Sequence, residues 1–330
     1  MHYFKFLIRD LEAKGHHFYI TARDKEVVHS LLDAFNIKYT GRGKGASSLA
    51  GKILYLIRAD LFLLSRAIKF KPDLFLSFAS PYAAHVSRLL GKPHIALTDT
   101  ENAPLGILSF APFTKHILTP VSFEKDFGKK HIRFNSFMEL SYLHPDHFKP
   151  DSSLLKKYGL TKAFVIIRFV SWDANHDIKQ TGFRAEDKIR LVRFLEKTHR
   201  VIISSESALP GELEKYRAMI RPEDIHSLLY HADLYIGEGA TMASEAAMLG
   251  TPAIYVNTLT AGTIKEQGKA GLVFRLTDYN AIEGKIIEIN PELPTGKFKK
   301  LRDKLLIDKI NLSKYLTNFV EGYPGSIKQL

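Results

Sequence analysis

Residues 235–254 read YIGEGATMASEAAMLGTPAI. An apolar stretch typical of a buried strand ends in GEG at 237–239, and a helical pattern follows directly. Glycines permit a tight turn and let a ligand approach the backbone closely. The free N–H groups at the start of the next helix, together with its dipole, favour an anion. The segment therefore predicts a strand–turn–helix unit that binds phosphate.

The rest of this segment extends the predicted site. Glu245 falls one turn into the helix, on a face that can reach hydroxyl groups beside the phosphates. The alternative is a tight turn without a ligand, in which Glu245 is merely exposed. The complete block, with its GTP exit at 250–252, favours ligand binding more than Gly-x-Gly alone does. The predicted ligand-binding residues are Gly237, Glu238, Gly239, Ala240, Thr241, Ser244, Glu245 and Arg168.

Short apolar runs alternate with helical patterns on both sides of a break at 143–152, which contains two prolines. The predicted strands are 17–22, 37–40, 74–78, 94–98, 116–119, 164–170, 201–205, 234–237, 253–257 and 272–276. The predicted helices are 3–14, 25–35, 48–70, 82–90, 186–197, 224–231, 241–249, 279–289 and 312–320. Strands that are apolar almost throughout are typical of a parallel sheet covered on both faces.

This alternation predicts an α/β fold of two Rossmann-like, doubly wound domains. The length of 330 residues suits two domains of roughly 150 residues each. We place the N-terminal domain at 1–146 and the C-terminal, ligand-binding domain at 147–330. The last helix, 312–320, is a candidate to pack back on the N-terminal domain. The ligand is expected in the cleft between the two domains.

The composition excludes several classes of protein. The chain has no cysteine, so disulfides, iron–sulfur clusters and cysteine-ligated zinc are excluded. Arg58 and Asp60 interrupt the most apolar stretch, which is therefore no membrane span. The N-terminus lacks the apolar run of a signal peptide, and we expect a cytoplasmic protein. No Asp-x-Asp occurs, so a metal-bound diphosphate and any metal site are not predicted.

Positive charge is concentrated between residues 38 and 71, where eight Lys or Arg residues accompany one acid, Asp60. The whole chain carries a net charge of +12. Such a surface attracts phosphates, nucleic acid or an anionic membrane, and the alternative is a plain solvated surface. No Cys/His finger and no aromatic RNA-binding run occurs, which argues against specific nucleic-acid binding. Peripheral membrane contact through 38–71 is one prediction, and a helix at 49–70 packed on the sheet is the other.

The segment at 237–252 resembles the nucleotide-sugar signature of GT-B-fold proteins, which include MurG-type N-acetylglucosaminyltransferases and non-hydrolysing UDP-N-acetylglucosamine 2-epimerases. The whole chain resembles an archaeal and bacterial family of unknown function that is predicted to belong to this superfamily. The segments that carry the second resemblance are 2–25, 98–103, 139–145 and 237–252. The resemblance implies a GT-B fold and a UDP-sugar ligand that serves as substrate, without a separate cofactor.

The resemblance also implies roles for individual residues. Glu245 matches the glutamate that holds the ribose hydroxyls of UDP, and residues 239–241 match the turn that receives the diphosphate. Relatives begin with a strand and a Gly-His-Pro-like loop near the acceptor. This sequence opens on the helix at 3–14 instead, so we expect either a start site placed too late or a genuine truncation.

Three further residues are candidate catalytic groups. Asp99 and Glu101 follow the strand at 94–98, at the edge where doubly wound sheets bind ligands, and paired carboxylates suit acid–base chemistry. Glu101 also stands where the epimerases carry a catalytic glutamate. The alternative is a helix cap at Asp99 or Thr100. His176 follows the strand at 164–170 and could exchange a proton near neutral pH, although a surface histidine is the plainer interpretation.

Three functions remain open. The first is a metal-independent glycosyltransferase that uses a UDP-sugar donor and an unknown acceptor, in cell-surface polysaccharide or glycolipid synthesis. The second is a 2-epimerase-like isomerase, which the departure from the epimerase His-Arg-x-Glu-Asn motif near His176 weakens. The third is a non-catalytic nucleotide-sugar-binding protein, favoured if the first strand is truly absent.

Overall fold

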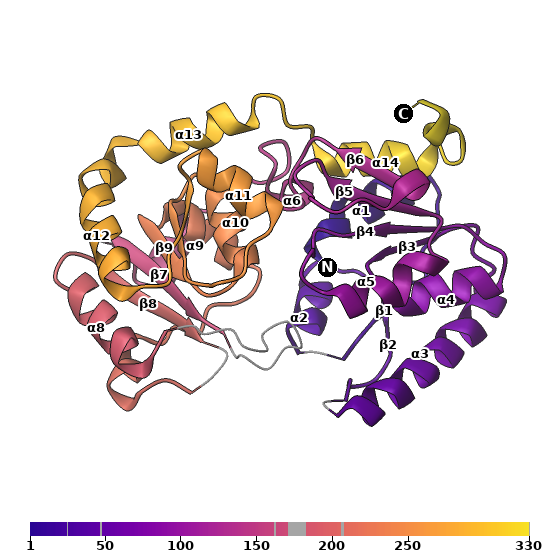
Figure 1. Ribbon diagram of the computed structural model, residues 1–330, viewed down its shortest axis with the longest axis horizontal. Helices are drawn as coiled ribbons and strands as arrows, with labels where there is room; N and C mark the ends of the chain where they lie inside the picture. The colour runs from indigo at the N-terminus through magenta and orange to yellow at the C-terminus, as the bar shows by residue number, and fades with distance from the viewer. Residues whose placement is uncertain (25, 47, 162, 171–182, 206–207, 330) are drawn as a thin grey trace. The chain divides into compact units, whose positions relative to one another are not determined.

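The structure is a computed structural model that describes residues 1–330 except 25, 47, 162, 171–182, 206–207 and 330. The chain divides into two compact units (Figure 1). Unit 1 contains Met1–Tyr142 and Ile310–Leu330, and unit 2 contains Leu143–Lys309. The division therefore falls after residue 142, four residues before the boundary placed from the sequence. The chain returns to unit 1 for its last 21 residues.

Unit 1 contains a four-stranded parallel sheet in the order β3-β4-β5-β6. The strands are β3 (Phe75–Phe78), β4 (His94–Leu97), β5 (His116–Pro120) and β6 (His131–Phe134). Two shorter strands, β1 (Thr21–Ala22) and β2 (Thr40–Gly41), form a separate parallel pair. The predicted strands 17–22, 74–78 and 94–98 were too long, 37–40 overlaps β2 only at Thr40, 116–119 was one residue short, and β6 was not predicted. The sequence of β6, HIRF, alternates apolar with polar side chains and is too short to show a clear period.

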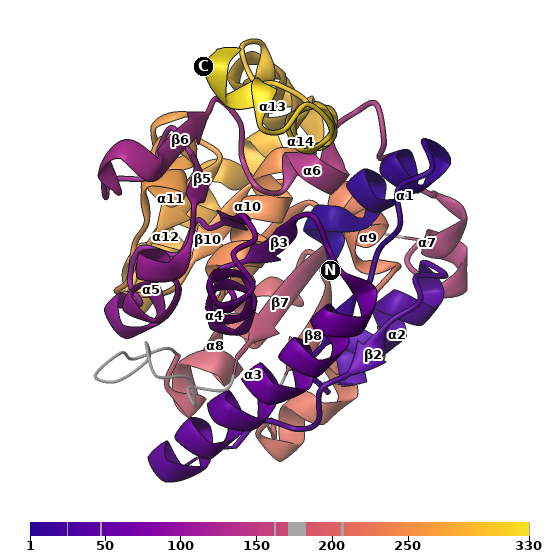
Figure 2. The ribbon, with the colours of Figure 1, turned by 90° about the vertical axis from the view of Figure 1, so that its right-hand side faces the viewer.

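The helices of unit 1 surround these strands. They are η1 (His2–Phe4), α1 (Lys5–Ala13), α2 (Glu26–Ala34), α3 (Leu49–Phe70), α4 (Pro81–Leu89), α5 (Pro104–Phe110), η2 (Ala111–Phe113), η3 (Gly128–Lys130), α6 (Leu140–Leu143), α14 (Leu312–Glu321) and η6 (Gly325–Gln329). Helices α1 and α14 lie side by side (Figure 2). Leu7 and Leu11 of α1 share one core cluster with Leu312 and Leu316 of α14. The C-terminal helix thus completes the core of the first unit.

Unit 2 contains a five-stranded parallel sheet in the order β11-β10-β9-β7-β8. The strands are β7 (Phe164–Phe169), β8 (Arg200–Ser205), β9 (Leu234–Gly237), β10 (Ala253–Tyr255) and β11 (Val273–Arg275). The helices are α7 (Ser153–Lys157), α8 (Ala185–Leu195), η4 (Gly211–Tyr216), α9 (Ile225–His231), α10 (Ala240–Leu249), α11 (Gly262–Lys269), α12 (Tyr279–Ile289), η5 (Asn290–Thr295) and α13 (Lys297–Leu306). The central strands β7 and β9 are buried almost completely, which is why both read as continuous apolar runs.

The strand order places a topological switch point between β7 and β9. The chain leaves β7 toward β8 on one side and later returns to β9 on the other side. The connections after β7 and β9 therefore diverge at the carboxyl ends of these two strands. Ligands of doubly wound sheets bind at such a point. The turn at 237–239 follows β9 and lies at this edge.

Candidate nucleotide-binding site

Gly237 and Gly239 differ in what a side chain at each position would meet. A Cβ atom at Gly237 would lie 2.2 Å from the hydroxyl oxygen of Tyr235 and 3.1 Å from the carbonyl oxygen of Arg168. Among the described residues, a Cβ atom at Gly239 would meet only Cγ1 of Val170, at an ordinary 3.6 Å, and its φ of −98° suits any residue. Packing therefore requires Gly237. Within the described part of the chain, no contact requires a glycine at position 239.

Helix α10 begins directly after this turn. Gly239 is the N-cap residue, and among the described residues no side chain caps the first turn. The first turn carries no acidic residue, Ala240 is partly exposed and Thr241 is exposed. The first N–H groups of a helix have no partner within the helix, and they concentrate its positive dipole end. This end of α10 can therefore accept an anion such as a diphosphate.

Glu238 takes a position that could not be predicted from the sequence. Its side chain is buried, and its two carboxylate oxygens accept the N–H groups of Val170 at 2.9 Å and Phe183 at 2.8 Å. The side-chain amide of Asn257 donates to its carbonyl oxygen at 3.0 Å. The carboxylate thus fastens the turn to the end of β7 and to residue 183. The side chain therefore has a structural role, and its predicted contact with a ligand stays a prediction.

Glu245 is buried in the second turn of α10 and contacts His226 of α9. The distance between His226 Nε2 and Glu245 Oε1 is 3.0 Å, and about 7% of each side chain is exposed. Sequence reasoning missed His226, because it stands 19 residues earlier on a different helix and only the packing of α9 against α10 brings the pair together. The carboxylate is held in one direction before any ligand arrives.

The other two predicted binding residues of this unit already have partners. Ser244 is buried, and its hydroxyl accepts a hydrogen bond of 2.7 Å from the side-chain amide of Gln267 on α11. Arg168 pairs with Gly237 in the sheet register, and its guanidinium donates to the Ser204 hydroxyl at 2.8 Å. Arg168 is partly exposed and lies at the switch point, so it remains placed to meet an anion. His176 lies outside the described residues.

Unit 1 places Asp99 and Glu101 together after β4, as predicted from their spacing. Burial raises the pKa of Asp99 to about 6, and the nearby charge of Glu101 adds to this effect. Glu101 is buried, and its Oε1 atom accepts the N–H group of Glu124 at 3.1 Å. The alternative helix cap is wrong, because the next helix, α5, has Ala103 at its N-cap and no side-chain cap there. The two carboxylates thus sit in different environments, an arrangement that separates an acid from a base.

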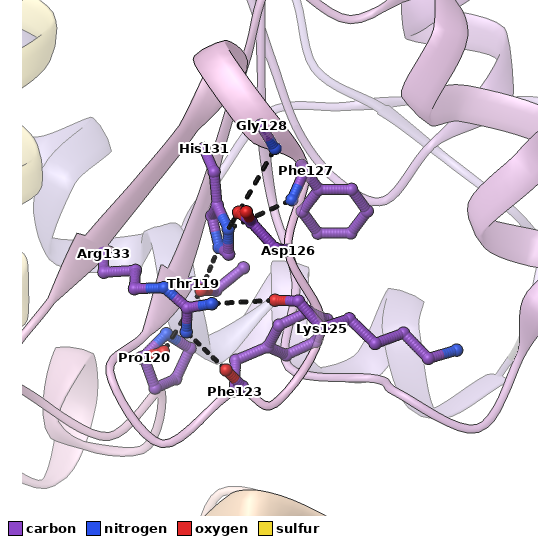
Figure 3. Close-up of polar contacts among 9 residues, drawn as sticks. All are labelled: Thr119, Pro120, Phe123, Lys125, Asp126, Phe127, Gly128, His131 and Arg133. Carbon is purple, nitrogen blue, oxygen red and sulfur yellow. Dashed lines mark hydrogen bonds and ion pairs between the residues drawn. The ribbon is translucent and has the colours of Figure 1, made fainter.

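The loop that contacts Glu101 is held by side chains of β6 (Figure 3). The guanidinium of Arg133 donates to the carbonyl oxygens of Phe123 and Lys125. His131 contacts Asp126 Oδ1 through Nδ1 at 2.9 Å and Thr119 Oγ1 through Nε2 at 2.8 Å. Burial lowers the pKa of His131. These contacts order the loop after β5, and they could not be predicted because β6 itself was missed.

Two further properties concern only the described part of the chain. No group of three or more His, Asp or Glu side chains within it is arranged to hold a metal ion. Within the same residues, no helix has the length and apolar character needed to cross a membrane.

The two parallel-sheet units and their switch-point turn define a two-domain α/β protein of the GT-B class. Residues 1–287 match the family described as "Protein of unknown function (DUF354)", and the chain belongs to this family. The uncharacterized protein MJ0665 of Methanocaldococcus jannaschii is 25% identical over 272 residues, which are 77% of each chain. The predicted fold class and family resemblance are thereby confirmed.

Solved structures show the same fold at low sequence identity. The UDP-GlcNAc 2-epimerase of Neisseria meningitidis bound to UDP-GlcNAc has a TM-score of 0.62 at 13% identity, and the match covers 100% of this chain and 96% of the epimerase. The glycosyltransferase of kitacinnamycin has a TM-score of 0.61 at 12% identity, covering 97% of this chain and 95% of that protein. Epimerases and glycosyltransferases therefore share the architecture of this chain.

Proposed function

We propose that the protein is a metal-independent glycosyltransferase that takes its sugar from a UDP-sugar donor, in the synthesis of a cell-surface polysaccharide or glycolipid. The observation that supports this most is the position of the turn at 237–239. It follows β9 at the switch point of the unit 2 sheet, where an uncapped helix N-terminus and a buried, oriented glutamate lie on one helix. Diphosphate and ribose carry the anion and the hydroxyl groups that such a pair of features recognises.

The donor would be held by unit 2. The N–H groups at the start of α10 would bind the diphosphate and stabilise the charge that develops on it as the sugar departs. The absence of a side chain at Gly239 would let the diphosphate approach the backbone. Glu245 would accept hydrogen bonds from the ribose hydroxyls, since His226 fixes the direction of its carboxylate. Arg168 would add a positive charge near the phosphates.

The acceptor chemistry would use the carboxylates of unit 1. In a transfer, an acceptor oxygen bonds to the anomeric carbon, the bond from that carbon to the diphosphate oxygen breaks, and UDP leaves. The acceptor hydroxyl must lose its proton, and Asp99 is the residue that we assign as base. A carboxylate with a pKa of about 6 is a stronger base than an ordinary aspartate and is still ionised near neutral pH.

The second candidate function is epimerisation of a UDP-sugar at C2. It is favoured by the Asp99 and Glu101 pair, because one group must remove the C2 proton and a group must return one. Incubation with UDP-N-acetylglucosamine in D₂O separates the two functions. Deuterium at C2 supports the isomerase, and sugar transfer without exchange supports the transferase. UDP binding without either reaction supports the third function, that of a non-catalytic binding protein.

The experiment that tests the shared basis of these functions is calorimetric titration with UDP. We expect micromolar binding that Glu245→Ala weakens by about tenfold or more, or ~1.4 kcal/mol. Glu288→Ala is a matched control, because Glu288 is an exposed glutamate on α12. If the folded protein does not bind UDP, the assignment fails and other nucleotides must be screened.

A cytoplasmic location remains a prediction, which fractionation of cells would test.

A further inference from the structure

Helix α3 presents three distinct faces along its 22 residues. Ala59, Leu63 and Ala67 are buried, and Leu63 and Ala67 form a core cluster with residues of β3 and α4, including Val86. Residues spaced by three or four lie on one side of a helix, so this buried face is a continuous stripe. The helix runs along the outside of unit 1 in both views (Figures 1 and 2).

The neighbouring face of α3 is apolar and exposed to solvent. Its residues, each more than half exposed, are Ile53, Leu54, Ile57, Leu61 and Ile68. At about 100° per residue, these five positions fall within an arc of roughly 100°. We call this surface the α3 apolar stripe. Scattered exposed apolar residues are ordinary, but an aligned set on one helix marks an interaction surface.

The third face of α3 is basic. Arg58, Arg66 and Lys69 are exposed, and at about 100° per residue they lie around the helix between the α3 apolar stripe and the buried stripe. The one acid of this region, Asp60, is partly buried and contacts His85 Nδ1 at 2.9 Å. Asp60 therefore does not neutralise the outer surface of α3, and that surface is positive. The charge that is complementary to this surface is negative.

We propose that the α3 apolar stripe and its basic flank dock the protein on an anionic lipid surface. A helix with adjoining apolar and basic faces lies in the plane of a membrane interface, with apolar side chains at the acyl boundary and Lys and Arg at the headgroups. A second copy of the chain is a poorer occupant, because an antiparallel symmetric contact would bring the two basic flanks together. This inference does not depend on the proposed sugar chemistry.

Sedimentation of the full chain with lipid vesicles tests the proposal. We expect binding to vesicles that contain phosphatidylglycerol, weaker binding in high salt, and little binding to pure phosphatidylcholine. Ile57→Glu and Leu61→Glu should each reduce the bound fraction about tenfold, since a charge at the acyl boundary opposes insertion. Ile287→Glu is the matched control on α12 of unit 2, because Ile287 is similarly exposed, and it should bind like the unaltered chain.

A labelling measurement covers the case in which a glutamate variant fails to fold. The chain has no cysteine, so Leu61→Cys and Ile287→Cys each give one site for a polarity-sensitive dye. Anionic vesicles should shift the emission of the dye to the blue at position 61 and leave it unchanged at position 287. The proposal is overturned if the unaltered chain ignores anionic vesicles, or if both dyes respond alike. It is also overturned if the chain dimerises and Leu61→Glu makes it monomeric.

Discussion

His226 Nε2 lies 3.0 Å from Glu245 Oε1, and both side chains are buried between α9 and α10. The contact joins the helix that follows the switch-point turn to the helix that precedes β9. A buried carboxylate needs hydrogen-bond partners, and each partner limits the directions in which the remaining lone pairs can act. His226 is thus the residue that we expect to orient Glu245 toward a ribose.

We predict that His226→Ala weakens UDP binding by about tenfold and also lowers the free energy of unfolding by roughly 1–3 kcal/mol. Calorimetry with UDP and with 2′-deoxy-UDP separates these effects. If His226 orients Glu245, the preference for UDP over 2′-deoxy-UDP falls, and His226→Gln, which keeps a donor, restores part of it. An equal loss for both ligands would show that His226 only supports the fold.

Alanine substitutions at the two glycines of the turn should have opposite consequences. Gly237→Ala places a methyl group 2.2 Å from the Tyr235 hydroxyl oxygen, and we expect a loss of stability of about 1–3 kcal/mol or more. Among the described residues, Gly239→Ala meets only an ordinary contact with Val170, so the stability should change little while UDP binding weakens. Urea unfolding and UDP titration of both variants check this. A Gly239→Ala variant that binds UDP normally would contradict backbone approach at this residue.

The raised pKa of Asp99 predicts a dependence of stability on pH. The folded-state pKa is about 6 and the ordinary value is 3.8, so the folded protein keeps this proton to a higher pH than the unfolded chain. Asp99 therefore costs stability progressively as the pH rises from about 4 to 6, and the full cost persists above that. Asp99→Asn should raise the free energy of unfolding by about 2 kcal/mol at pH 7.5 and leave it unchanged near pH 3.5. Urea unfolding at both pH values measures the difference.

Asp99→Asn should abolish sugar transfer at every pH, since an amide cannot accept the proton of the acceptor. In the unaltered enzyme the transfer rate should rise with pH through about 6, as Asp99 ionises. A pH–rate profile with each candidate acceptor checks this. A rate that is flat from pH 5 to 8 would exclude Asp99 as the base.

Glu238→Ala should destabilise unit 2, because it leaves the N–H groups of Val170 and Phe183 without their acceptor. We expect a loss of about 2 kcal/mol or more, and a smaller loss for Glu238→Gln, which retains one acceptor oxygen. Urea unfolding gives the magnitude, and hydrogen exchange at the two amides locates it. Glu288→Ala, at an exposed site, serves as the control. Unchanged exchange at both amides would argue against the fastening role of Glu238.

Arg133→Ala should loosen the loop after β5 without unfolding unit 1. The substitution removes the donors to Phe123 and Lys125, so amide exchange across 121–130 should accelerate by about tenfold or more, equivalent to ~1.4 kcal/mol. Glu101 accepts an N–H group of this loop, and a change in its environment should therefore follow. Exchange at the wild-type rate would mean that His131 and Asp126 suffice to hold the loop.

The alternation of apolar strands with helices was enough to predict the fold class and the elements of unit 2 around β9. Parallel strands buried on both faces, such as β7, must be apolar throughout, and that requirement is visible along the chain. Elements with weak periodicity could not be recognised in this way. Strand β6 and helices α11 and α13 were not predicted.

The sequence by itself determined the two-domain α/β architecture, the glycine turn at the end of β9 and the adjacency of Asp99 and Glu101. Each of these depends on residues that are neighbours along the chain. Tertiary structure alone decided that Glu238 is enclosed by backbone N–H groups and that His226 meets Glu245. It also decided that one apolar side of α3 remains uncovered. These features depend on which faces of separate elements pack together, and a hydrophobicity pattern shows that a face is apolar without showing what covers it.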